Sequence, residues 1–199
     1  PTVTWMIDFT QKKFGLISLG CDKNRVDAEK LLSRIEERGC TITNDIDQAN
    51  VLIVNTCSFL EASRREAIET IIDCAANRGC NLEKIVVTGC LPQKFIDEVY
   101  PALTEADVFL GTYDYELFFE ALEKAYAEGR CNMTGMGKDA FYGGRVVTTP
   151  LHYAYLKIAD GCSNCCTYCL IPKIRGRYTS YPMEQLISEA SSLGELSEL

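Results

Sequence analysis

Short apolar runs alternate with amphipathic segments between residue 14 and residue 128. The runs are rich in β-branched and aliphatic residues and predict buried strands at 14–19, 40–43, 51–55, 84–89 and 107–111. The segments between them carry apolar residues at helical spacing and predict helices at 24–38, 60–78, 92–99 and 113–128. Apolar strands that alternate with helices form a mainly parallel sheet that is covered on both faces. We therefore predict a doubly wound α/β domain over residues 12–129.

The pattern changes after residue 129. Residues 130–152 are rich in Gly and Thr and show no period, which indicates a linker or an irregular crossover. The segment 153–160 alternates as a strand does, and apolar residues from Pro182 onward recur at helical spacing. One strand, one loop and one helix cannot close a core, so residues 153–199 are expected to be only the beginning of a second domain.

Bulk composition narrows the class of protein. The chain has 199 residues, is 47% hydrophobic and carries a net charge of −8, which disfavours binding of a nucleic-acid backbone by electrostatics alone. No apolar run reaches the length of a membrane span, and the first residues lack the pattern of a secretory signal. The chain begins with Pro1 rather than Met, so we expect a trimmed chain or a fragment.

The 11 cysteines are the unusual feature. A disulfide framework belongs mainly to small secreted domains, and this chain has neither an export signal nor a shortage of apolar residues. Clustered cysteines in a reducing compartment are more often metal ligands or catalytic groups. We therefore predict thiolate ligands and a cytoplasmic location.

One group of cysteines follows the predicted strands. We name it the sheet-edge triad, and it consists of Cys21, Cys57 and Cys90. In a parallel sheet the carboxyl ends of all strands lie on one edge, so these residues are expected to converge there. Three thiolates at one edge could hold an iron–sulfur cluster with one open iron, and the alternative is that each is a small buried residue.

A second group lies in one short loop. We name it the loop triad, and it consists of Cys162, Cys166 and Cys169. Thiolates are the usual ligands of Fe–S clusters, and three of them on four irons leave one iron for an exogenous group. This spacing favours radical chemistry on S-adenosylmethionine. Zinc would need a fourth ligand. Cys165 could replace Cys166 in a zinc site but is expected to be a spare thiol, and His152 is expected to be a linker residue.

The cysteine contexts carry a family resemblance. The sequences SLGCDKNRVDAE (18–29), VNTCSF (54–59), VTGCLPQ (87–93) and KIADGCSNCCTYCLIPKIRGRY (157–178) resemble the radical S-adenosylmethionine methylthiotransferases over most of residues 14–190. Within that family they resemble the RimO type, which modifies an aspartate of a small-subunit ribosomal protein. The alternative is the MiaB type, which modifies a tRNA adenosine.

The resemblance implies two 4Fe–4S clusters and S-adenosylmethionine as cofactors. The loop triad would hold the cluster that binds and cleaves S-adenosylmethionine at the start of a partial (β/α) barrel. The sheet-edge triad would hold an auxiliary cluster for sulfur insertion. Tyr168 would lie near the cofactor or simply pack in its loop. Asn24 and Asp27 could line the auxiliary site, although a helix N-cap is the plainer interpretation of Asn24. A reductant such as flavodoxin or ferredoxin would supply electrons.

The sequence also departs from the family pattern. Thr179, Ser180 and Tyr181 stand where the family commonly has Arg-Ser-Arg, and Cys165 replaces a basic or polar residue. The rest of the barrel and a small C-terminal barrel do not follow the loop, so we expect the isolated chain to lack methylthiotransferase activity. The rival classes are a non-catalytic iron–sulfur carrier, which would use four cysteines per cluster, and a zinc-stabilised binding module.

Overall fold

The computed structural model describes residues 7–76, 78–137, 143–150, 152–194 and 196–199. Its first region contains strands β1 (Lys13–Ser18), β2 (Thr41–Thr43), β3 (Val51–Thr56), β4 (Lys84–Gly89), β5 (Val108–Phe109) and β6 (Cys131–Asn132). The helices of this region are α1 (Asp22–Glu37), α2 (Glu61–Ala76), α3 (Cys90–Ala102) and α4 (Phe118–Glu128), with short 3₁₀ turns at Phe9–Gln11, Ile46–Gln48 and Tyr115–Leu117.

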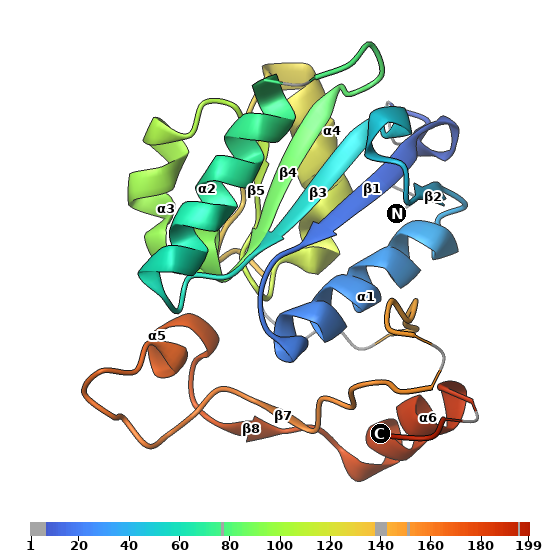
Figure 1. The fold of residues 1–199 in the computed structure, drawn as a ribbon, viewed down its shortest axis with the longest axis vertical. Helices are drawn as coiled ribbons and strands as arrows, with labels where there is room; N and C mark the ends of the chain where they lie inside the picture. The colour runs from blue at the N-terminus through green and yellow to red at the C-terminus, as the bar shows by residue number, and fades with distance from the viewer. Residues whose placement is uncertain (1–6, 77, 138–142, 151, 195) are drawn as a thin grey trace.

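The strands form one sheet in the order β2-β1-β3-β4-β5-β6, and every neighbouring pair is parallel. The chain runs outward from β1 in both directions, first to β2 and then to β3. The carboxyl ends of β1 and β3 therefore form the topological switch point, which is where doubly wound sheets bind their ligands. Figure 1 shows all these strand ends on the side of the sheet that faces α5.

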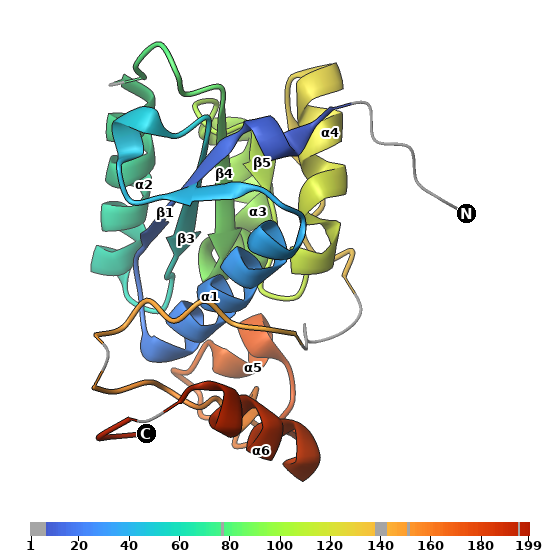
Figure 2. The ribbon, with the colours of Figure 1, turned by 90° about the vertical axis from the view of Figure 1, so that its right-hand side faces the viewer.

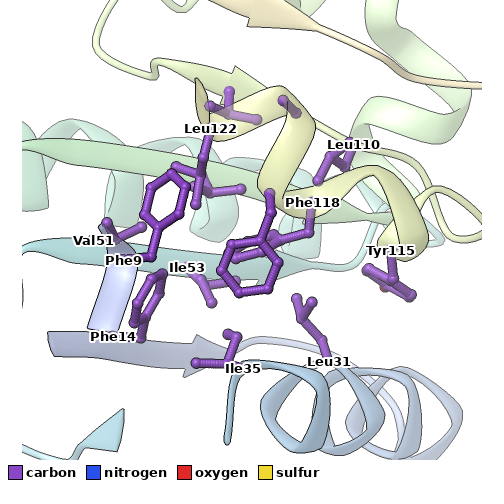
Figure 3. Close-up of a cluster of buried hydrophobic side chains, with 14 of the residues drawn as sticks. Phe9, Phe14, Leu31, Ile35, Val51, Ile53, Leu110, Tyr115, Phe118 and Leu122 are labelled. Atoms are coloured by element: carbon purple, nitrogen blue, oxygen red, sulfur yellow. The ribbon is translucent and has the colours of Figure 1, made fainter. Parts of the chain in front are cut away.

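Helices cover both faces of the sheet (Figure 2). One buried cluster packs α1 and α4 on the sheet through Phe14, Leu31 and Phe118, and Figure 3 shows these side chains interlocking. A second cluster packs α2 and α3 on the other face through Leu52 and Ile71. Successive residues of β3 thus alternate between two apolar interiors, and this is why the strand is apolar throughout its length.

The α/β prediction is confirmed. Helix α3 is longer than expected and begins at Cys90, and β5 is shorter. Strand β6 was not predicted, because its two residues lie in the segment indicated as a linker and are too few to show a period. They nevertheless pair with β5 and extend the sheet.

The prediction of a strand over 153–160 is wrong for most of its length. Only β7 (Ala159–Asp160) forms, and it pairs antiparallel with β8 (Thr179–Ser180). The buried residues of this segment are Ala154, Lys157 and Asp160, which are spaced by three rather than by two. Lys157 is buried against Asp27 of α1 rather than by strand pairing. The alternation in the sequence therefore does not correspond to burial on one face of a strand.

The second region, which comprises residues 153–194 and 196–199, also contains α5 (Ile171–Arg175) and α6 (Met183–Ser192). The sequence predicts the second helix from Pro182 onward, and the structure confirms it. Helix α5 lies beside the carboxyl edge of the sheet, and α6 lies farther along the same side (Figure 1). Both hydrophobic clusters found among the described residues lie in the α/β domain. Within the described residues, no helix has the length and apolar character needed to cross a membrane.

Candidate functional site

The structure brings the sheet-edge triad together at the switch point. Cys21 is the N-cap of α1 after β1, Cys57 follows β3 directly, and Cys90 follows β4 as the first residue of α3. All three line one pocket of about 810 Å³. Residues that are far apart in the chain thus meet because parallel strands end on a common edge.

The pocket wall requires glycine at the turn before Cys90. Gly89 has φ +96°, and a Cβ atom there would lie 2.5 Å from the Thr56 carbonyl oxygen and 2.7 Å from Asn55 Oδ1. No L side chain fits at that distance, and the positive φ is itself unfavourable for any other residue. The close approach of β4 to β3 is what directs Cys90 towards the pocket that Cys57 lines.

The thiols differ in their surroundings. Cys21 is exposed, Cys57 is half-buried and Cys90 is buried. Burial raises the pKa of the Cys90 thiol to about 11, while Arg175 acts to lower it and the neighbouring Cys57 and Cys21 act to raise it. The thiol of Cys90 is therefore protonated at neutral pH in the free chain, and a metal centre would have to displace this proton.

Asn24 connects the triad to the second region, and the N-cap interpretation is wrong. The cap position belongs to Cys21, whereas Asn24 lies inside α1 and is fully buried. Its Nδ2 donates to the Thr56 carbonyl oxygen at 2.7 Å. Its Oδ1 accepts from Arg175 Nη2 at 2.7 Å and from the Cys90 thiol at 3.6 Å. A buried amide with three partners is a fixed part of the site and does not serve as a helix cap.

A buried cluster of charges lies next to Asn24. Lys157 Nζ binds Asp27 and Asp160 at 2.6 Å each, and Arg175 Nη1 binds the same carboxylates at 2.8 and 3.0 Å. We name these four residues the charge cluster, and each is less than 10% exposed. Burial acts to raise the pKa of Asp160, but Arg175 and then Lys157 hold it below its ordinary value. Two carboxylates are thus balanced by two cations.

Sequence reasoning missed most of this cluster. Lys157 and Asp160 interrupt an alternating apolar segment, and Asp27 stands next to Val26 on the buried side of α1. Charged residues at positions of apolar periodicity are the signal that could have found it. The pairing itself was not predictable, because α1 and the second region are far apart in sequence.

The loop triad has a more open setting. Cys162 and Cys169 are half-buried, and Cys166 is exposed. The Cys162 N–H donates to the Gly176 carbonyl oxygen at 3.1 Å, and the Cys169 N–H donates to the Cys166 carbonyl oxygen at 3.0 Å. The loop is therefore held at its base and closed by a tight turn between its last two cysteines.

Other predicted residues of this loop are also exposed. Tyr168 is 83% exposed, so the alternative in which it simply packs in its loop is not supported. Cys165 is exposed and has φ +51°, the only positive value of a non-glycine residue among those described. His152 is exposed and contacts Tyr153 at 5.0 Å between ring centres, outside both triads.

Both triads have the chemistry of cluster ligands. All described cysteines are free thiols, as ligation requires. Among the described residues, no three His, Cys, Asp or Glu side chains gather closely enough for one metal ion. In a 4Fe–4S cluster each thiolate binds a different iron, so the sulfur atoms stand farther apart than around a single ion. Three thiols around a shared pocket fit a cluster better than a single zinc ion.

Comparison with known proteins gives the same assignment. Residues 13–111 match the family described as "Uncharacterized protein family UPF0004". The chain is 46% identical over 190 residues to the ribosomal protein uS12 methylthiotransferase RimO of Clostridium tetani, covering 94% of this chain and 42% of the relative. It is 42% identical over 188 residues to the protein of that name from Thermoanaerobacter sp., covering 92% and 42%. The chain thus spans about two-fifths of the length of the curated relatives it matches.

Residues 13–111, which match this family, contain strands β1 to β5 of the parallel sheet. The chain is a relative of the RimO methylthiotransferases and corresponds to their N-terminal portion. The resemblance found in the cysteine contexts is confirmed.

Proposed function

We propose that the chain is the cluster-binding part of a radical methylthiotransferase that inserts a methylthio group at an unactivated C–H of an aspartate in ribosomal protein uS12. The observation that carries this proposal is the meeting of Cys21, Cys57 and Cys90 at one pocket. The names of the relatives support the ribosomal protein as substrate over a tRNA adenosine.

The two triads would take different roles. The loop triad would hold the cluster that binds S-adenosylmethionine, with Tyr168 beside the cofactor, and the sheet-edge triad would hold the auxiliary cluster. When bound, these groups supply reductive cleavage of S-adenosylmethionine and the sulfur that is transferred. A small carrier such as flavodoxin or ferredoxin would donate the electrons. The reduced thiols that ligation requires suit the cytoplasm.

The pocket also has apolar walls. Phe59 and Leu60 line it after β3, and Ile174 lines it from α5. Its charged lining is mixed, with Lys23 and Arg175 beside the carboxylates of Asp22 and Glu66. Apolar walls would help to exclude water from the reacting carbon.

The first experiment measures iron and acid-labile sulfide per chain after anaerobic reconstitution. We compare the wild type with two triple alanine variants, one for each triad. About eight irons in the wild type and about four in each variant are expected for two independent clusters. Cys80→Ser is the matched control, because this exposed thiol belongs to neither triad. Bound zinc without sulfide in the wild type would instead support the zinc-stabilised module.

A second experiment tests the substrate. A longer protein that contains this chain is incubated with S-adenosylmethionine, a reductant and either ribosomal protein uS12 or tRNA. Mass spectrometry is expected to detect one added methylthio group on an aspartate of uS12. Methylthiolation of the tRNA alone would assign the protein to the MiaB type.

A further inference from the structure

We propose that Arg175 is a positioning residue that ties the segment bearing the loop triad to the sheet-edge triad and holds a permanent positive charge beside Cys90. In this position Arg175 raises the reduction potential of a cluster bound at the sheet-edge triad. The inference rests on the proposed function, because it requires a cluster at that site.

The position of Arg175 in the chain gives it this connecting role. It is the last residue of α5, shortly after Cys169, yet its side chain reaches into the α/β domain. Nη2 donates to Asn24 Oδ1 at 2.7 Å and lies 4.0 Å from the Cys90 sulfur. The hydroxyl of Tyr113 donates to the Arg175 carbonyl oxygen at 2.7 Å, so the backbone is held as well.

The guanidinium is fixed by several partners at once. Nη1 binds the carboxylates of Asp27 and Asp160, while Nη2 is left for the amide and the sulfur. A planar fork can make these contacts in fixed directions, whereas a lysine ammonium acts as a single point charge. An arginine guanidinium stays protonated in proteins, so the charge is permanent.

Lys157 gives the natural comparison within the charge cluster. It neutralises the same two carboxylates and is equally buried, at 6% exposure for each residue. In the part of the chain that the structure describes, the nitrogen that reaches the Cys90 sulfur belongs to Arg175 and not to Lys157. Substituting each cation in turn therefore distinguishes the effect of contact with the Cys90 sulfur from the effect of buried charge balance.

A fixed cation near a ligand sulfur favours the reduced cluster. Reduction adds one electron from the carrier and makes the cluster more negative, and a nearby cation stabilises this added charge. The interaction is only weakly screened because Arg175 is buried. Removing the charge is expected to make the cluster harder to reduce, and keeping a charge at that position preserves part of the effect.

The test uses the full chain with Cys162, Cys166 and Cys169 replaced by alanine, so that only the sheet-edge cluster can form. Arg175→Met, Arg175→Lys and Lys157→Met are introduced into it. Dithionite titration followed by electron paramagnetic resonance gives the midpoint potential. Arg175→Met is expected to shift the reduction equilibrium at least tenfold towards the oxidised cluster, which is about 59 mV for one electron. Lys157→Met is expected to shift it much less, and Arg175→Lys is expected to be intermediate.

The outcomes separate this inference from the proposed function. An assembled cluster whose potential is unchanged in Arg175→Met, or equally changed in Lys157→Met, overturns the inference alone. Failure of the parent chain to assemble any cluster overturns the proposed function and this inference with it. If Arg175→Met cannot hold iron, retention of the cluster by Lys157→Met supports the positioning role, and loss in both variants overturns it.

The contact that Arg175 makes between the two regions can be tested separately in the metal-free chain. Hydrogen exchange of the amides in β7 and β8 is expected to become faster in Arg175→Met, because the segment loses the contacts of Arg175 with Asn24 and Asp27 of α1 and keeps only that of Lys157 with Asp27. Unchanged exchange in this variant would overturn the tie, whatever the potential shows.

Discussion

The two triads are built by different means. The loop triad lies within one short loop that is held by hydrogen bonds at its base and at one turn. The sheet-edge triad is collected from the ends of β1, β3 and β4, and each of these strands is fixed by the packed core. The loop triad is therefore a property of local sequence, whereas the sheet-edge triad exists only when the sheet has formed.

The thiols of the two triads are therefore expected to respond differently to loss of core packing. Loss of core packing is expected to disperse the sheet-edge thiols, since nothing in the local chain holds them together. The loop thiols stay close in an unfolded chain because few residues separate them.

Phe14→Ala is expected to have the largest effect. The side chain is fully buried and packs against Phe118 at 6.1 Å and Phe119 at 6.3 Å between ring centres. Removing it costs about 3–5 kcal/mol of unfolding free energy. In a urea titration of the reconstituted chain, iron at the sheet-edge triad is expected to be lost at lower urea than in the wild type. Iron at the loop triad should follow the wild-type curve, and equal losses at both triads would contradict the contrast.

Gly89→Ala tests the edge of the sheet directly. The added Cβ would meet the Thr56 carbonyl oxygen at 2.5 Å, so β4 must move away from β3. Backbone strain of this kind costs about 1–3 kcal/mol, and about four of the eight irons are expected to be lost.

Gly129→Ala is the matched control for this variant. Its φ of +93° is similar to that of Gly89, but nothing lies within 4 Å of the added Cβ. It is expected to cost about 1–2 kcal/mol and to keep all the iron. Retention of full iron by Gly89→Ala would show that the turn does not fix the triad.

Alkylation of the metal-free chain measures the environment of Cys90. The thiolate is the reactive form, and burial raises the pKa of Cys90 to about 11. Below that pH the thiol is protonated, so its rate with iodoacetamide is expected to rise about tenfold per pH unit up to about pH 11. Peptide mass spectrometry follows each cysteine, with the denatured chain as the reference. Labelling of Cys90 at the same rate in the folded and denatured chains would show that it is not buried.

Cys165→Ser is expected to have the smallest effect. The side chain is exposed, so the unfolding free energy should change by less than about 0.5 kcal/mol. Iron at the loop triad should be retained, because Cys162, Cys166 and Cys169 are the expected ligands. Cys166→Ser is the matched comparison and is expected to lose that cluster. Loss of metal from Cys165→Ser instead would favour the zinc arrangement of Cys162 with Cys165.

The sequence alone determined the class of fold. The continuous apolar run of β3 predicts a strand buried on both faces, and the structure shows Leu52 and Ile53 in opposite cores. The position of Cys21, Cys57 and Cys90 after strands was also visible, because the rule that parallel strands end on one edge needs no coordinates. The sequence segments around the cysteines identified the family, because each segment is local and can be recognised without coordinates.

Only the tertiary structure decided what surrounds those cysteines. Asparagine is a residue type that often caps helices, yet Asn24 is buried within α1, where its side chain contacts β3 and the second region. Arg175 and Asp27 stand far apart in sequence and form an ion pair at 2.8 Å. Periodicity and composition report which residues are buried, but they carry no information on which distant residue is the partner. Pairing of buried charges depends on how the two regions pack, and that packing is a property of the folded chain.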